Sequence, residues 1–208
     1  MGLVLILSLA AGCSREARRD RHLKKAETFY AAKDYRKAVI EYINALRLDS
    51  GSAVCLNRLG SLYQEQGQIN RALPLLVKAH AITPKDRALM SQLLRIYRDL
   101  RENTKAREMA LRILAEDPAH EEALIALADT ATTPEDQADL ASRVEKLRGQ
   151  GGDRAIFHVV AGMQSARRKE WDTAEAAFQQ AIALNSNSLP SRLILQAFYL
   201  MRGRLEEA

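Results

Sequence analysis

Cys13 is the residue of this sequence whose surroundings most clearly suggest a chemical modification. An uncharged apolar run of nine residues, Leu3 to Ala11, comes first, and the small residue Gly12 leads directly to the cysteine. The run is too short to cross a hydrocarbon core of about 30 Å, which needs roughly 20 residues. Its length is typical of the apolar part of a secretory signal peptide. Residues 1–12 are therefore predicted to be a signal segment.

The stretch Ala10-Ala11-Gly12-Cys13 resembles the lipobox of bacterial lipoproteins. In that family the cysteine is diacylated and becomes the mature N-terminus, and two or more acyl chains give lasting attachment. The resemblance implies lipidation of Cys13 and a place in the bacterial cell envelope, on the periplasmic face. Ser14 resembles the pattern for outer-membrane delivery. The alternative is an uncleaved N-terminus with an incidental cysteine, in a cytoplasmic protein.

The segment after Cys13 is strongly basic. Its charged residues include Arg15, Arg18, Arg19, Arg21, Lys24 and Lys25. We expect residues 13–18 to form a membrane-proximal linker, where Lys and Arg beside anionic lipid would help anchoring. The alternative is a solvated linker leading into the first helix. If Cys13 is acylated, the second cysteine, Cys55, has no disulfide partner within the chain. We then expect Cys55 to pack as a small apolar side chain.

The remaining reactive side chains predict no catalytic centre and no metal site. The histidines lie at least 38 residues apart, so no two share a helical turn as a metal pair would; they are His22, His80, His120 and His158. Neighbouring carboxylates such as Glu121 and Glu122 diverge on a helix and cannot act as an acid–base pair. No phosphate-binding glycine loop or nucleophile motif is present. The sequence therefore predicts neither an enzyme nor a cofactor.

Composition favours helices and argues against nucleic-acid binding. The chain has 208 residues, and only 5% of them are aromatic, with five prolines and ten glycines. The net charge of +5 comes from 31 basic and 26 acidic residues that are mixed along almost the whole chain. A solvated helical surface looks like this, and no basic stripe with interleaved aromatic residues indicates RNA or DNA.

Residue types recur with a spacing of 34, which indicates an internal repeat. Alanines lie at positions 38, 72, 106 and 174, and small residues recur earlier in the units, as at Gly60 and Gly162. Prolines follow at Pro84 and Pro118, where each would end a second helix because it has no N–H to donate. Only small side chains would let two helices approach closely, so we expect Gly60 to lie against Ala72.

This pattern resembles the tetratricopeptide repeat family, whose unit is about 34 residues long. The resemblance covers residues 19–208 and implies an all-α fold, a right-handed superhelical solenoid of antiparallel helix pairs. Its units would be 19–52, 53–86, 87–120, a degenerate 121–154, 155–188 and a partial 189–208. In the degenerate unit Leu140 stands where alanine is expected. Stability would come from stacking of neighbouring units.

The family binds protein partners in a groove lined by the first helices, which implies a candidate site here. The residues expected to face a partner are Asn57, Gln64, Arg95, Arg98, Ile156, Val159 and Met163, with Leu193, Leu200 and Met201 beyond them. The apolar members mark either a partner site or a face that packs against further units. The residues that form a carboxylate clamp in one subclass of the family are absent.

These observations predict a protein-interaction scaffold, anchored through Cys13, that supports an envelope assembly or secretion system. The long repeat lipoproteins associated with exopolysaccharide and protein-sorting systems are the most similar subgroup. Two alternatives stay open: a regulatory module of a larger enzyme that continues beyond residue 208, and a cytosolic adaptor or co-chaperone.

Overall fold

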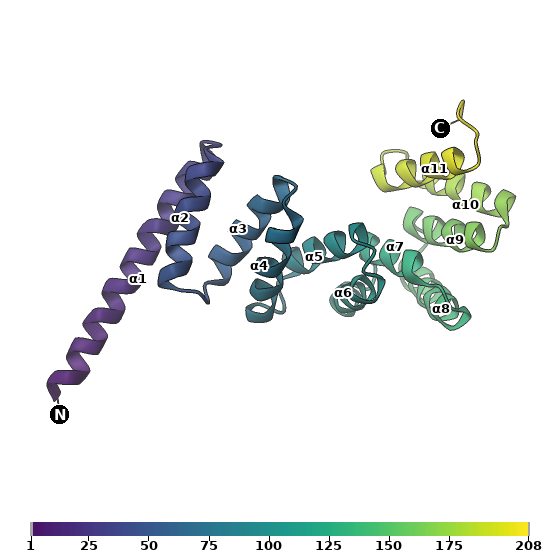
Figure 1. The fold of residues 1–208 in the computed structure, drawn as a ribbon. Coiled ribbons are helices and arrows are strands. Elements are labelled where there is room, and N and C mark those ends of the chain that lie inside the picture. Colours follow the sequence, from purple (N-terminus) through teal and green to yellow (C-terminus); the bar gives the residue numbers. More distant parts are fainter. Residues whose placement is uncertain (1, 208) are drawn as a thin grey trace. The chain divides into compact units, whose positions relative to one another are not determined.

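The chain is folded entirely into helices in the part that is described. The structure is a computed structural model that describes the backbone of residues 2–207 and the side chains of residues 14–207. These residues form eleven α-helices and no strand (Figure 1). The all-α prediction is therefore confirmed. The chain divides into two compact units, residues 1–96 and 97–208, which are described separately.

The first unit is built from pairs of helices that fold back on one another. Its helices are α1 (Gly2–Ala31), α2 (Tyr35–Leu48), α3 (Ala53–Glu65), α4 (Ile69–Ile82) and most of α5 (Arg87–Asp99). Helix α1 packs against α2, α3 packs against α4, and α2 contacts α3 (Figure 1). Alanines repeat through these contacts because a methyl group is the largest side chain that allows the helices to come so close; Ala26, Ala38 and Ala72 are all fully buried.

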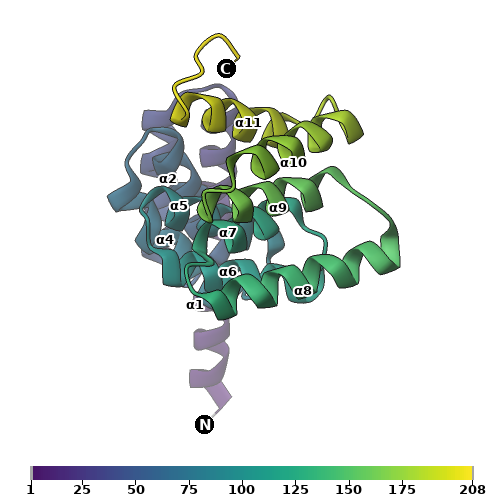
Figure 2. The same cartoon turned by 90° about the vertical axis from the view of Figure 1, so that its right-hand side faces the viewer.

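The second unit continues the same arrangement after one irregular pair. Its helices are α6 (Asn103–Glu116), α7 (Glu121–Thr130), α8 (Pro134–Gly151), α9 (Ala155–Arg167), α10 (Trp171–Leu184) and α11 (Leu189–Met201). Figure 2 shows α9, α10 and α11 stacked in succession. Helix α7 packs against α6 and α9, and α10 packs against both α9 and α11.

The irregular pair is the unit that the sequence marks as degenerate. Helix α7 has 10 residues and α8 has 18, whereas the regular pairs that follow and precede have 13 and 14. Leu140 is buried in α8 at the position where the other units carry alanine. A leucine at such a position needs more room between two helices than a methyl group does, and α7 and α8 are still in contact.

The turns within the regular pairs share one backbone geometry. One residue in each of these turns, and one in the turn after α11, has a left-handed φ of 57° to 73°; in chain order they are Lys33, Gly67, Arg101, Lys169 and, after α11, Gly203. In the turn at Gly67, the N–H of Gly67 donates to the carbonyl of Gln64. The N–H of the next residue, Gln68, donates to the carbonyl of Tyr63. This pair of bonds is the Schellman motif, which satisfies the last carbonyls of a helix. Three of the five turns place a long side chain where glycine is the least strained residue.

Two glycines allow close helix crossings. A Cβ added to Gly60 would lie 2.7 and 2.8 Å from side-chain carbons of Leu76, and 3.4 Å from the carbonyl oxygen of Ala72. The predicted tight crossing at Gly60 is thus confirmed, although the nearest neighbour is Leu76 and not Ala72. A Cβ on Gly162 would lie 2.5 to 2.9 Å from the ring of Phe178.

Candidate functional site

The histidines have structural partners. His22 Nδ1 lies 2.6 Å from a carboxylate oxygen of Glu41, and His158 Nε2 lies 2.6 Å from one of Asp153. His120 is the N-cap residue of α7, and its ring nitrogen accepts a hydrogen bond from the N–H of Ala123. Among residues 14–207, no three His, Cys, Asp or Glu side chains are grouped so that they could hold a metal ion.

In the first unit, two of the predicted groove residues belong to one polar cluster. Asn57 and Gln64 lie on α3, at either side of Ser61, and all three are half-buried. The amide of Gln92 on α5 donates to Ser61 Oγ at 3.0 Å and to Gln64 Oε1 at 2.6 Å. The hydroxyl of Ser61 also lies 3.3 Å from Asn57 Oδ1. The cluster is therefore a hydrogen-bonded seam between the first helices of two neighbouring repeats.

The predicted arginines lie on α5. Arg95 is exposed in the first unit. Arg98 belongs to the second unit and directs Nε and one terminal nitrogen at Asp129 Oδ2, at 3.1 and 2.5 Å. Because both of these hydrogen bonds hold the guanidinium against α7, Arg98 has a fixed position at the edge of the second unit's surface.

The three apolar residues predicted on α9 have different environments. Ile156 is 3% exposed and Val159 is 1% exposed, so both side chains contribute to the core of the second unit and are not accessible to a partner. This differs from the expected position in an open groove. Nearly the whole circumference of α9 is apolar, and α7, α8 and α10 all pack against it. Met163 is only partly buried and packs against the cluster of Phe178, Phe198 and Tyr199.

Met163 lines an open apolar cleft of about 430 Å³ on the second unit. The cleft is bordered by α9 and α11, and its apolar lining consists of Met163, Ala166, Phe178, Ile194, Ala197, Phe198 and Met201. Asp129 and Arg167 form its polar edge. Arg167 is held there because it donates to the carbonyl oxygens of Ala128 and Asp129, at 3.1 and 2.9 Å.

A second hollow of about 560 Å³ shares Ile194 with the first. It lies between α7 and α11, with Ile125, Leu189, Pro190 and Leu193 as its apolar lining and Arg98, His120, Glu121 and Glu122 as its polar lining. The two hollows adjoin at Ile194, and we name their combined lining the α7–α9–α11 cleft. Leu193 is 53% exposed and Met201 is 62% exposed, so α11 presents large apolar side chains to solvent.

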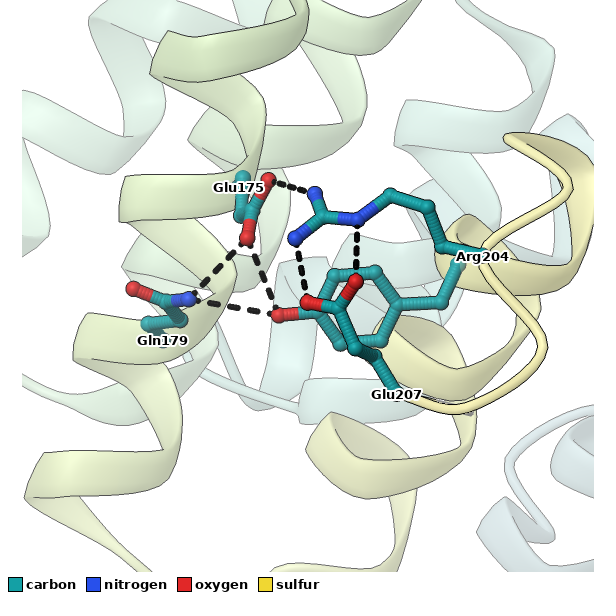
Figure 3. A network of polar contacts seen from close by, with 5 residues as sticks. Glu175, Gln179, Arg204 and Glu207 are labelled. Atoms are coloured by element: carbon teal, nitrogen blue, oxygen red, sulfur yellow. Dashed lines mark hydrogen bonds and ion pairs between the residues drawn. The ribbon is translucent and has the colours of Figure 1, made fainter.

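A polar network attaches the residues after α11 to α10 (Figure 3). Arg204 pairs with both Glu175 and Glu207, and the hydroxyl of Tyr199 donates to Glu175 at 3.1 Å. Gln179 donates to the same hydroxyl at 3.2 Å. The Arg204 guanidinium and the Tyr199 hydroxyl lower the pKa of Glu175 below its ordinary value. These contacts hold the end of α11 and the residues after it against α10.

Sequence reasoning missed several lining residues. Gln92 belongs to the polar cluster of α3 and α5, and Ile125 and Ile194 line the α7–α9–α11 cleft, but none of the three was predicted as a site residue. Helical spacing could have indicated Gln92, because it lies three residues before the predicted Arg95 on the same helix. Ile194 adjoins Leu193, and its inward tilt depends on how α11 packs against α9.

The predicted modification site lies outside the described side chains. Cys13 is part of helix α1, as are residues 13–18, which were expected to form a linker, but its side chain is not described. Within the described part of the chain, no helix combines the length and the apolar character that a membrane crossing requires. Cys55 is a free, buried thiol on α3, in agreement with a packing role.

Comparisons with known proteins agree with this architecture. A tetratricopeptide repeat family model matches residues 63–130. A search of curated proteins gave no match. Among solved structures, a tetratricopeptide repeat protein from Parabacteroides merdae superimposes with a TM-score of 0.71 at 19% identity, over 90% of this chain and 75% of that one.

Two further solved structures are similar. One is YrrB, described as a TPR protein with an unusual peptide-binding site, with a TM-score of 0.65 and 19% identity over 85% of this chain and 89% of that chain. The other is a thermophilic TPR protein of Thermus thermophilus, with a TM-score of 0.52 and 27% identity over 75% of this chain and 86% of that chain. The chain therefore has the tetratricopeptide repeat fold, and its residues 63–130 carry the sequence pattern of that family.

Proposed function

We propose that this chain is a non-catalytic scaffold that binds a protein partner in the α7–α9–α11 cleft and is held at the bacterial cell envelope by acyl chains on Cys13. The observation that carries the scaffold role is the apolar lining of the α7–α9–α11 cleft, where Leu193 is 53% exposed and Met201 is 62% exposed. An apolar surface edged by charged groups is typical of a protein-binding site. The peptide-binding site named for YrrB supports the same type of ligand.

The chemistry of the cleft suggests the character of the partner segment. Two methionines, Met163 and Met201, lie in the lining, and their unbranched side chains adapt to different apolar shapes. Arg98 and Arg167 are already held by Asp129 and by backbone carbonyls, so they define the edge of the cleft and keep its floor apolar. A segment with several apolar side chains, such as an amphipathic helix, fits this surface.

The scaffold role is tested by photo-crosslinking from single positions in the producing bacterium. A photoreactive residue in place of Leu193 should yield a discrete crosslinked protein, whereas one in place of Arg112, on the exposed side of α6, should not. The crosslink should disappear when Met201→Glu is added. Equal crosslinking from both positions would show that the cleft has no selective partner.

The anchor rests on the sequence Ala10-Ala11-Gly12-Cys13 and is tested independently. Acyl label should enter the wild-type chain and not Cys13→Ala, and the labelled chain should fractionate with the outer membrane, as Ser14 favours. If neither chain takes up label and residues 1–12 stay attached in a soluble protein, the anchor is refuted. The repeat array would then act as a cytosolic adaptor.

A further inference from the structure

The excess positive charge of the chain is concentrated in one short stretch of α1. Residues 14–25 contain six basic and two acidic side chains, a net charge of +4, whereas the whole chain has +5. The other residues are therefore nearly neutral in sum. Such a local excess creates a positive potential that is confined to the first part of α1.

The structure divides the six basic residues into two groups. Arg15 and Arg19 face the rest of the first unit: Arg15 Nε donates to the carbonyl of Leu48 at 2.7 Å, and Arg19 pairs with Asp49 at 3.0 Å and Asp20 at 2.7 Å. Hydrogen bonds to both carboxylates raise the pKa of Arg19. These two arginines therefore help to attach α1 to the end of α2.

The other four basic residues lie on the part of α1 that is turned away from α2. At 100° per residue, Arg21 and Lys24 lie roughly opposite the buried Ala26, and Arg18 and Lys25 lie about 80° and 100° from it on one flank. Arg18, Arg21 and Lys25 follow one another at helical spacing, and Lys24 lies beside them. All four are exposed, and within the described side chains none of them takes part in an ion pair. Ala26, which is fully buried, marks the side of the helix that packs on α2.

No acidic residue interrupts this face. With 100° of rotation per residue, Glu16, Asp20 and Glu27 lie together on a neighbouring side of the helix. Glu27 is occupied there by the Tyr42 hydroxyl at 3.0 Å and by Arg58 at 3.1 Å. The uncharged residues that share the basic face are small, and they are Ser14, Ala17 and Thr28. None of them offers an aromatic ring on which a nucleic-acid base could stack.

We propose that the outer face of α1, formed by Arg18, Arg21, Lys24 and Lys25, binds anionic lipid headgroups, so that the first turns after Cys13 lie along the membrane surface. This rests on the proposed membrane attachment, which would bring the face to the lipid. The four side chains span about 10 Å of helix, comparable to the distance of about 8 Å over which charges act at physiological salt. They can therefore all contact headgroups at the same time.

The test compares the full-length, unacylated chain on two kinds of vesicle, phosphatidylcholine with and without phosphatidylglycerol. Any contribution of the apolar residues 3–11 is common to both, so the ratio of the two partition coefficients isolates the electrostatic part. Replacing Arg18, Arg21, Lys24 and Lys25 by Gln should lower this ratio by about fivefold per residue. Added salt should lower the wild-type ratio towards that of the variant.

A matched control removes the same number of charges elsewhere. Lys105, Arg112, Arg143 and Lys146 are exposed residues of α6 and α8, and replacing them by Gln gives the same net charge. This control should keep the wild-type ratio. The proposal is overturned if the control lowers the ratio as much as the α1 variant, or if the α1 variant keeps the wild-type ratio.

The vesicle experiment tests the lipid-binding face of α1 independently of the acyl anchor and of the partner-binding cleft. The α1 variant should still take up acyl label at Cys13 and still crosslink from position 193. Absence of acyl label in the wild-type chain would refute the anchor without changing the vesicle ratio, whereas an unchanged ratio would refute only the lipid-binding face.

Discussion

The crossing of α9 and α10 at Gly162 provides the most direct test of how tightly this array is packed. An added Cβ would lie 2.5 Å from Cε1, 2.6 Å from Cδ1 and 2.9 Å from Cζ of Phe178. The ring is 2% exposed and its centroid lies 5.3 Å from that of Phe198. Because the buried ring also packs against the Phe198 ring, a shift of Phe178 disturbs the core.

Gly162→Ala combines two opposing effects. Overpacking of a core costs about 1–3 kcal/mol, while replacing glycine by alanine inside a helix gains up to about 1 kcal/mol. The net expectation is a loss of about 0–2 kcal/mol in the free energy of unfolding. Gly149 on α8 supplies the matched control, because nothing lies within 4 Å of a Cβ added there. Gly149→Ala should therefore show only the gain.

Urea unfolding of the full chain, followed by circular dichroism, measures both variants. The difference between them should be about 1–3 kcal/mol, since the gain in helix propensity is common to both. Phe178→Leu should reduce the loss caused by Gly162→Ala, which appears as a coupling energy in a double-mutant cycle. If Gly162→Ala stabilises the chain as much as Gly149→Ala, the reasoning from the close crossing is refuted.

Three further outcomes follow from individual contacts. Lys169 has a left-handed φ of 64°. Lys169→Gly should raise the free energy of unfolding by about 0.5–1 kcal/mol, because glycine relieves the backbone strain of the folded state and this gain exceeds the larger conformational entropy that glycine gives the unfolded chain. An unchanged urea midpoint would contradict this. Arg204→Gln should destabilise the chain at neutral pH but have less effect in acid. The pKa of Glu175 is lowered in the folded state, so the stability that the ionised carboxylate contributes is present above its unfolded pKa and is lost as the pH falls through the folded pKa. Thermal unfolding of both chains at neutral and acidic pH would measure this difference. Burial raises the pKa of the Cys55 thiol. In the Cys13→Ala variant, a thiol reagent should therefore modify Cys55 far more slowly in the native chain than in urea. Equal rates would show that α3 is not closely packed.

Much of the architecture could be predicted from the sequence because it depends on local properties. The 34-residue spacing of alanines and small residues gave the helix pairs and their phase, and Gly60 indicated a close crossing. The degenerate unit could also be recognised, since Leu140 stands at a position that tolerates only a small residue in the other units. Helix propensity, residue size and proline geometry act over a few residues, so the sequence determines them directly.

The candidate surfaces were predictable only in part. Asn57 and Gln64 do lie together, and Met163 does line a cleft. Ile156 and Val159 were expected in the same groove but are buried, because α9 is apolar on almost every side and its sequence does not say which sides the neighbouring helices cover. The lipidation of Cys13 remains a prediction from the sequence.

The sequence by itself determined the all-helical repeat, its period and the basic segment after Cys13. Only the tertiary structure decided which of those basic residues are occupied and which are available: Leu48 and Asp49 hold Arg15 and Arg19, and four others remain on the outer face of α1. The tertiary structure likewise decided that α11 turns Leu193 towards a cleft shared with α7, some 70 residues earlier in the chain. Such contacts depend on how helices that are distant in sequence stack, and no pattern within one repeat can specify them.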